Sequence, residues 1–195
     1  MLDTTERNDS LAVALRAYGA TWPAEAECVD RFIELVEAAG NPYVRERLEG
    51  HLTASSLVVS ADGRRTLLTH HRKLGLWLQP GGHADGDTDL ARVALREAEE
   101  ETGLAGLVIE PGIFDLDLHW IPEHKGVPAH WHYDVRYIVR AGRDERFTVS
   151  EESHALAWRD IASLAADPSM DGSLRRMARK WLQRQVGERP PGPAR

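Results

Sequence analysis

The segment that most constrains the fold of this chain is PGGHADGDTDLARVALREAEEETGL, at residues 80–104. Its second half has helical periodicity from residue 89 to residue 102, and a glycine follows to end the helix. Three carboxylates stand at i, i+3 and i+4 and therefore share one face of this predicted helix: Glu97, Glu100 and Glu101. The neighbouring face is formed by Ala91, Ala94, Leu95 and Ala98. The sequence thus predicts a helix that packs on its alanine side and carries an acidic stripe beside that contact.

Clustered carboxylates repel one another, and at the C-terminal end of a helix they also face the unfavourable end of the macrodipole. This arrangement is explained if hard cations bind among the oxygens, because Mg²⁺ and Mn²⁺ prefer carboxylate, carbonyl and water ligands. The two glycines before the helix allow a sharp turn and a close approach of the backbone, so a glycine carbonyl could join the metal ligands. The alternative for the acidic run alone is a solvated helix surface.

The whole segment resembles the Nudix box, G-x5-E-x7-R-E-U-x-E-E-x-G-U, where U is an aliphatic residue. Gly82 matches the first glycine, seven residues separate position 88 from Arg96, and positions 96–104 match one by one, with Ala98 as a small U. The pattern departs at one position, because Thr88 stands where the first glutamate is expected. That glutamate is largely structural in the family, so no role is carried onto Thr88.

The resemblance implies a fold and a reaction. The fold is an α+β, Nudix-type α/β/α sandwich with a mixed sheet, and the reaction is attack of water on phosphorus in a nucleoside diphosphate linked to another moiety. By this resemblance Mg²⁺ or Mn²⁺ is bound by Glu97, Glu100, Glu101 and the Gly81 carbonyl, and Arg96 orients the glutamates by a salt bridge. The general base varies in the family, and the candidates here are Glu100, Glu101, Glu151 and Glu152.

Several residues outside the box are candidates for binding the substrate. His83 directly follows the box glycine, Trp77 could stack on a base, and Arg136 could bind phosphate. His130, His132 and Asp134 alternate along a predicted strand and share a face. With His83 and His119 they could form a zinc site or a phosphate-facing patch, but we interpret them first as a polar strand face with hydrogen-bonded histidines.

Composition excludes other classes of function. The formal net charge is −7, which argues against nucleic acid and anionic membranes as partners. The small, nucleotide-like phosphoanhydride substrate is implied by the resemblance, and bound cations would offset its repulsion by the carboxylates. The single cysteine, Cys28, excludes an intramolecular disulfide, and no stretch is apolar enough for a membrane span. The N-terminus does not resemble a signal peptide, so we expect a cytoplasmic protein.

Three regions are expected along the chain. Residues 1–50 form a helical N-terminal extension, with residues 1–9 disordered, a helix that begins at Ser10 and stops at Gly19, a second helix from Thr21 to about Ala39, and a short third helix at residues 43–50. Residues 51–187 form the Nudix domain, with a hairpin of residues 52–60 and 65–71, a short strand at residues 76–79 that ends at Pro80, and later strands and helices. Residues 188–195 form a disordered tail.

Two functional alternatives to a hydrolase remain open. A non-catalytic Nudix domain could act as a nucleotide-binding or regulatory module, and residues 10–50 could form an interaction module or a homodimer contact. The intact glutamate triad favours catalysis, because a pure binding protein has no need of so unfavourable a charge cluster.

Overall fold

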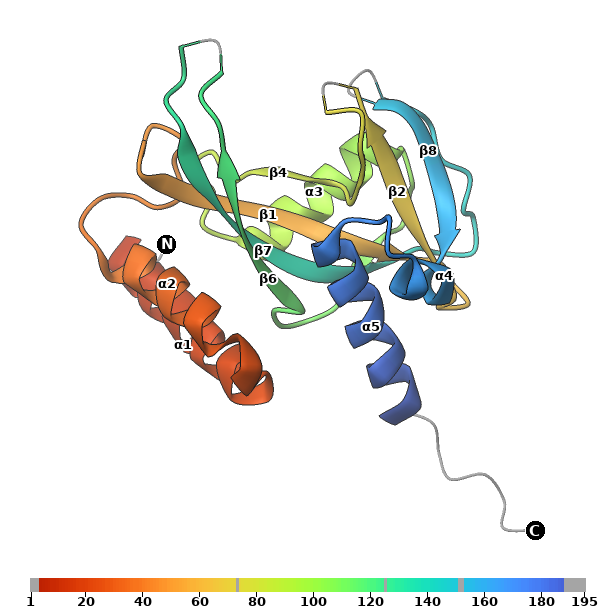
Figure 1. Cartoon of the computed structure of the whole chain (residues 1–195), viewed down its shortest axis with the longest axis horizontal. Coiled ribbons are helices and arrows are strands. Elements are labelled where there is room, and N and C mark those ends of the chain that lie inside the picture. Colours follow the sequence, from red (N-terminus) through yellow and green to blue (C-terminus); the bar gives the residue numbers. More distant parts are fainter. Residues whose placement is uncertain (1–3, 73, 125, 151–152, 188–195) are drawn as a thin grey trace.

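A computed structural model describes residues 4–72, 74–124, 126–150 and 153–187 of the chain (Figure 1). In chain order its elements are α1 Thr4–Thr21, the 3₁₀ helix η1 Pro23–Glu25, α2 Ala26–Glu37, β1 Gly50–Val59, β2 Arg65–His71, β3 Trp77–Leu78, β4 Gly81–His83, α3 Leu90–Thr102, β5 Val108–Ile109, β6 Asp115–Ile121, β7 His130–Arg140, β8 Ser153–Asp160, α4 Ile161–Ala166 and α5 Gly172–Gly187.

One mixed sheet of eight strands organises the domain. Its central path runs β3-β2-β1-β7-β5, with β4 paired to β1, β6 to β7 and β8 to β2. The central pair β1–β7 is parallel over the full length of β1, from Gly50 opposite Trp131 to Val59 opposite Arg140, and the other pairs are antiparallel. The expected hairpin is present, because β1 and β2 pair across the turn at residues 60–64. The mixed sheet confirms the expected fold class.

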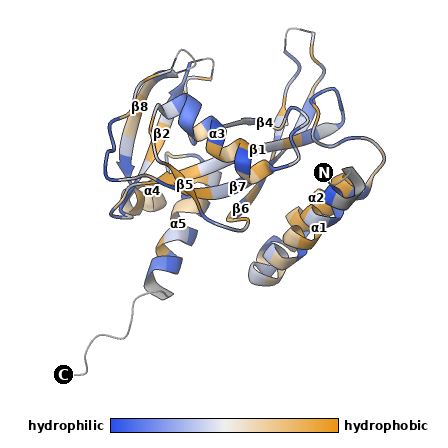
Figure 2. Ribbon diagram, turned by 180° about the vertical axis from the view of Figure 1, so that it is seen from behind, coloured by the Kyte–Doolittle hydropathy of each residue, from blue (hydrophilic) through white to orange (hydrophobic). Residues whose placement is uncertain are grey.

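Helices cover both faces of the sheet, and alternation along β1 shows how. Leu57 and Val59 point to the face packed by α4 and α5, with Met177 and Trp181 in the same buried cluster. Val58 points to the opposite face, in a cluster with Ala98 of α3. Figures 1 and 2 show α3 on one side of the sheet and α4 and α5 on the other. The chain therefore forms the expected sandwich, with the acidic helix as one of its outer layers.

The N-terminal helices precede the sheet as expected, but their boundaries differ. Helix α1 already includes residues 4–9, and it continues past Gly19 to Thr21. Gly19 lies inside α1, where a Cβ would sit 3.4 Å from the Val29 Cγ1 atom of α2, so this glycine allows two helices to pack closely instead of ending one. Residues 1–3, and the tail at residues 188–195, lie outside the described residues.

The third short helix expected at residues 43–50 is absent, and this part of the chain forms turns. The Asn41 side chain accepts a hydrogen bond from the Tyr43 amide at 2.9 Å, and the Tyr43 carbonyl accepts from the Gly86 amide at 2.8 Å. One partner is local, and the other comes from the box loop, the segment between β4 and α3. Together they satisfy these backbone groups, so no helical hydrogen bonds are required. Among the described residues, no helix is long and apolar enough to cross a membrane.

Candidate active site

Helix α3 begins and ends where local chemistry predicts. The Asp89 side chain caps its N-terminus by accepting a hydrogen bond from the Arg92 amide at 3.0 Å. Gly103 follows its last turn with φ +65°, a conformation that favours glycine. The buried side of α3 includes Ala94 and Ala98, as expected, and also Leu90 and Val93. The apolar side is therefore broader than the alanine pattern predicts.

The glycine pair forms a short strand, β4, where the sequence suggested only a turn. Strand β4 pairs antiparallel with β1, placing Gly81 opposite Ser55 and Gly82 opposite Ala54. A Cβ on Gly81 would lie 2.3 Å from the Ser55 Cβ atom, and a Cβ on Gly82 would lie 2.6 Å from the Glu97 carboxylate carbon. Both positions therefore need glycine, but for different reasons. Gly81 allows β4 to approach β1, and Gly82 leaves room for Glu97.

The three box glutamates differ in exposure. Glu101 is 9% exposed and accepts a hydrogen bond at Oε1 from the Gly81 amide at 2.8 Å. The Glu97 side chain is 19% exposed and accepts from Arg96 at 2.9 Å. The Glu100 side chain is 65% exposed and lies 4.0 Å from the Arg96 guanidinium. The glutamates thus form a stripe that runs from the buried edge of β4 to the solvent.

Arg96 lies where the resemblance expects an orienting cation. Its hydrogen bond to Glu97 raises the pKa of the Arg96 guanidinium above its ordinary value, with a further contribution from the charge of Glu100. The candidate metal ligands around the glycine pair are all oxygen atoms, which suits Mg²⁺ or Mn²⁺. The gap above Gly82, which a Cβ would fill, leaves the Glu97 carboxylate beside the backbone of β4. The residues present therefore fit a hard divalent ion.

Position 88 has a contact that the sequence did not predict. The Thr88 hydroxyl accepts a hydrogen bond from the Arg7 guanidinium of α1, so the N-terminal helices reach the box loop. The carboxylates on either side of Thr88 make other contacts. Asp89 caps α3, and Asp87 forms a salt bridge with Arg92 at 2.7 Å. In this chain the residue at position 88 therefore connects the loop to α1.

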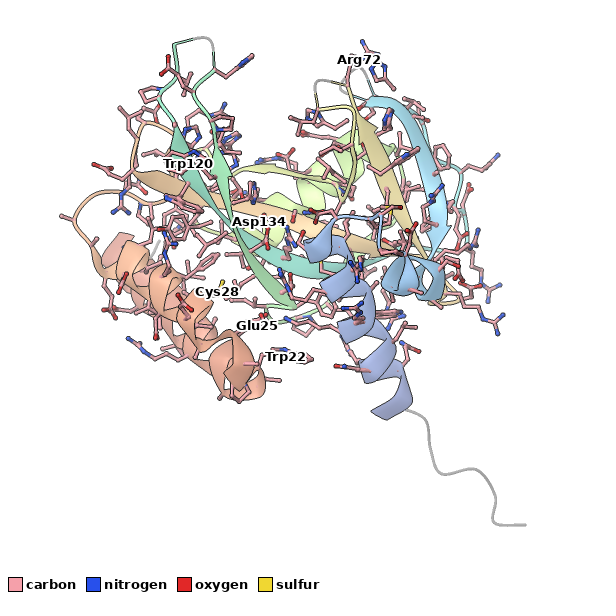
Figure 3. The ribbon with its side chains drawn as sticks, viewed as in Figure 1. Trp22, Glu25, Cys28, Arg72, Trp120 and Asp134 are labelled. Carbon is pink, nitrogen blue, oxygen red and sulfur yellow. The ribbon has the colours of Figure 1, made fainter. Side chains whose placement is uncertain are left out.

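Arg136, expected to bind substrate, lies inside the protein. Its side chain is 2% exposed, and its guanidinium contacts Asp134 at 2.7 Å, Asp117 at 3.1 Å and Asp115 at 3.3 Å. Figure 3 shows Asp134 over the middle of the sheet. The structure thus places Arg136 in a buried ion cluster that joins β6 and β7, instead of facing a substrate.

This cluster extends to α5 and to the N-terminal helices. Arg176 contacts Asp115 and Asp117, each at 2.8 Å. Lys180 contacts Asp115 at 2.7 Å and Glu25 at 2.6 Å, and in Figure 3 Glu25 lies on the side of the N-terminal helices that faces α5. The buried charges therefore connect three parts of the chain that are far apart in sequence.

The remaining candidates are spread over the sheet. Trp77 is half-buried on β3, with the His70 ring 5.1 Å from its ring and the Arg159 guanidinium 5.7 Å above it. Its contacts are thus with β2 and β8, away from the pairing of β4 with β1. Two of the general-base candidates, Glu151 and Glu152, lie outside the described residues.

His83, at the end of β4, lies among other histidines. Its ring is 5.2 Å from that of His51 and 4.9 Å from that of His132, and the rings of His119 and His130 lie 5.3 and 5.0 Å from that of His132. Burial lowers the pKa of His83 to about 4 and the pKa of His132 to about 2. His51 was missed in the sequence because it directly precedes the predicted strand. The register of β1 with β7, which places His51 opposite His132, brings it into the cluster.

The chain is thus an α+β domain in which a mixed sheet lies between helices and the carboxylates of one helix pack against a glycine-containing strand. The model of one protein family, the NUDIX domain, matches residues 50–181. The chain belongs to the Nudix family. A comparison with curated proteins finds no match.

Solved structures share the fold at low sequence identity. The chain is similar to a C. elegans Ap4A hydrolase in a binary complex, with TM-score 0.54, 18% identity, and coverage of 70% of this chain and 98% of that one. It is similar to a MutT protein from Methanosarcina mazei Go1, with TM-score 0.56, 17% identity, and coverage of 71% and 97%. It is also similar to the E. coli dihydroneopterin triphosphate pyrophosphohydrolase, with TM-score 0.52, 15% identity, and coverage of 68% and 95%.

Proposed function

We propose that this protein is a divalent-metal-dependent hydrolase that cleaves a pyrophosphate bond in a nucleoside diphosphate linked to another moiety. The observation that carries this proposal is the contact of Glu101 with the Gly81 amide at 2.8 Å, together with the packing of Glu97 against Gly82. These contacts hold the Glu97 and Glu101 carboxylates against the glycine strand.

The ligands proposed for the ion are Glu97, Glu100, Glu101 and the Gly81 carbonyl. When bound, Mg²⁺ or Mn²⁺ would supply positive charge that offsets the charge of the phosphate oxygens and makes a water molecule more acidic. Such a cation also accounts for an acidic stripe in a protein that binds a polyanion, because the carboxylates alone would repel phosphate.

The side chains of the protein have separate tasks in this reaction. Arg96 holds the Glu97 carboxylate in place through the hydrogen bond at 2.9 Å, and the Gly81 amide does the same for Glu101 at 2.8 Å. The oxygen of a water molecule attacks phosphorus, the phosphoanhydride P–O bond breaks, and the proton of the water passes to a carboxylate. On α3 the candidate bases are Glu100, which reaches solvent, and Glu101. Glu151 and Glu152 remain candidates.

Two comparisons support the substrate class. The similar structures include proteins named for hydrolysis of Ap4A and of dihydroneopterin triphosphate, both of which contain phosphoanhydride bonds. The proposed products are accordingly a nucleoside monophosphate and the phosphorylated remainder of the substrate. Such a substrate is small and anionic, which agrees with an acidic protein only if a metal ion is bound.

Metal-dependent turnover of a substrate panel tests the proposal. The panel contains nucleotide sugars, ADP-ribose, dinucleoside polyphosphates and nucleoside triphosphates, each with EDTA-treated protein and with Mg²⁺ or Mn²⁺ added back. We expect cleavage of at least one compound only when metal is present. Full activity without metal would contradict the mechanism. Saturable binding of a nucleotide with no turnover under any condition would support the non-catalytic binding module instead.

A further inference from the structure

Histidines from three strands meet on the face of the sheet opposite α3. Strand residues alternate between faces, so His83 projects away from the side on which Gly82 contacts Glu97. His51 and His132 are direct partners in the parallel β1–β7 register, and His83 lies opposite Thr53 in the next pair. The β4 strand therefore has the box glutamates on one side and a histidine cluster on the other.

The donor atoms of this cluster converge closely. One ring nitrogen each from His51, His83 and His132 lies within 4.8 Å of the others. Among the residues that the structure describes, no other set of three histidine, cysteine, aspartate or glutamate donors meets this limit, and the box glutamates do not. The histidines are thus the tightest grouping of such donors described in the protein.

Hydrogen bonds assign the proton positions of two of these rings. The Nδ1 atom of His51 lies 3.3 Å from the Arg47 carbonyl, so it donates there and Nε2 carries the lone pair. The Nδ1 atom of His130 lies 2.7 Å from the Pro128 carbonyl, so its Nε2 accepts a hydrogen bond from His132 Nε2 at 3.2 Å. The proton of His132 is then on Nε2, and its Nδ1 carries the lone pair.

The unprotonated nitrogen of His51 has no hydrogen-bond partner. His51 is 2% exposed, and its Nε2 atom is buried and unpaired in the structure. Leaving a buried polar atom without a partner is unfavourable, so such an atom needs an explanation. Histidines that bind metals commonly donate their other ring N–H to a backbone carbonyl, as His51 does to Arg47. The unpaired atom and the oriented ring therefore both point to a bound cation.

We propose that His51, His83 and His132 bind a borderline divalent transition metal ion of the Zn²⁺ type, at a site separate from the box glutamates. Neutral imidazole nitrogens suit Zn²⁺ and its neighbours, whereas Mg²⁺ and Mn²⁺ favour oxygen donors. Three protein ligands leave a fourth position for water or another donor. The ion connects β4 to β1 and β7, and so fixes the strand that carries the glycine pair. This inference does not depend on the proposed hydrolase activity.

Calorimetric titration of the full chain with Zn²⁺, in Mg²⁺ sufficient to saturate the oxygen site, tests the proposal. We expect one Zn²⁺ bound per chain, and at least about a hundredfold weaker binding in His132→Gln and His83→Gln. Two control variants should keep the affinity within about threefold: Glu100→Gln, which alters the box, and His154→Gln, which alters an exposed histidine outside the cluster.

Thermal unfolding distinguishes lost metal binding from lost folding. Zn²⁺ at a hundredfold excess over its Kd should raise the unfolding temperature of the native chain by about 5 °C or more. The histidine variants should unfold cooperatively in EDTA but show no such rise. His83 and His132 are only half-buried, so they are safer to replace than His51. The proposal is overturned if Zn²⁺ does not bind in the presence of Mg²⁺, if folded His83→Gln and His132→Gln bind it as tightly as the native chain, or if Glu100→Gln abolishes the binding.

Discussion

The backbone amide of Gly81 donates a hydrogen bond to Oε1 of Glu101 across 2.8 Å. This bond joins the glycine strand to the last turn of α3, and it fixes one carboxylate of the acidic stripe at a buried position. Because Glu100, the next residue back along the helix, points to solvent, the two neighbouring glutamates have different environments.

Glu100→Gln and Glu101→Gln should each lower turnover by at least about a hundredfold, or roughly 2.7 kcal/mol in the barrier. The amide keeps the size of the side chain and nearly its helix propensity, but it removes a negative charge from the proposed metal site. Steady-state kinetics in Mg²⁺, on a substrate that the native chain cleaves, measures the effect. Glu99→Gln is the matched control on the same helix, since Glu99 is exposed and lies outside the triad. Native turnover in all three variants would mean that the box glutamates take no part in catalysis.

The two glycines of β4 should respond differently to alanine. In Gly82→Ala the new Cβ meets the mobile end of Glu97, so the carboxylate moves and turnover falls about tenfold to a hundredfold, while the unfolding temperature changes little. In Gly81→Ala the Cβ meets Ser55 and the Ala54 carbonyl of β1, so the free energy of unfolding should fall by roughly 1–3 kcal/mol or more. Thermal unfolding and turnover of both variants check this contrast. A reversed pattern would show that Gly82, not Gly81, sets the spacing of the strands.

Thr88→Glu should leave turnover within about tenfold of the native value, or roughly 1.4 kcal/mol. The new carboxylate lies next to Arg7, which already donates to Thr88, so an ion pair can replace the hydrogen bond. Kinetics on the variant tests this expectation, and Thr88→Val, which removes the acceptor without adding charge, serves as its control. A loss of several orders of magnitude in Thr88→Glu alone would reveal a part for this loop in catalysis.

Lys180→Met should lower the free energy of unfolding by about 3–5 kcal/mol, because it removes a buried cation that pairs with two carboxylates. Asp115 keeps Arg136 and Arg176 as partners, but Glu25 loses its ion pair with Lys180. Lys180 is 4% exposed and pairs with both Asp115 and Glu25. Denaturant unfolding measures the change, and Arg179→Met, at the exposed neighbouring position of α5, is the control. Equal stability of the two variants would mean that the Lys180 ion pairs do not stabilise the protein.

Local patterns predicted local structure well. The span, the terminal glycine and the alanine side of α3 were all predicted from spacing, because each depends on residues within a turn or two of one another. The prediction of a short helix at residues 43–50 was wrong, because this segment depends in part on a contact distant in sequence. Its backbone bonds to Asn41 and to Gly86 of the box loop, and the second of these partners is distant in sequence.

The placement of Arg136 shows a similar limit. An arginine on an alternating strand looks the same in sequence whether it faces solvent or three aspartates. The environment of the guanidinium depends on the neighbouring strand, and here Asp115 and Asp117 come from β6. Only the folded chain shows that this guanidinium is buried.

The sequence by itself determined the family, the acidic helix and the glycine pair, because these depend on the order and spacing of residues in one segment. The tertiary structure decided which side chains meet across the sheet. The parallel register of β1 with β7 places His51 beside His132 and Thr53 beside Asp134, residues 81 positions apart in the chain. Side-chain alternation within a strand can be deduced from sequence, but the register between distant strands is set by packing of the whole core, and no local pattern encodes it.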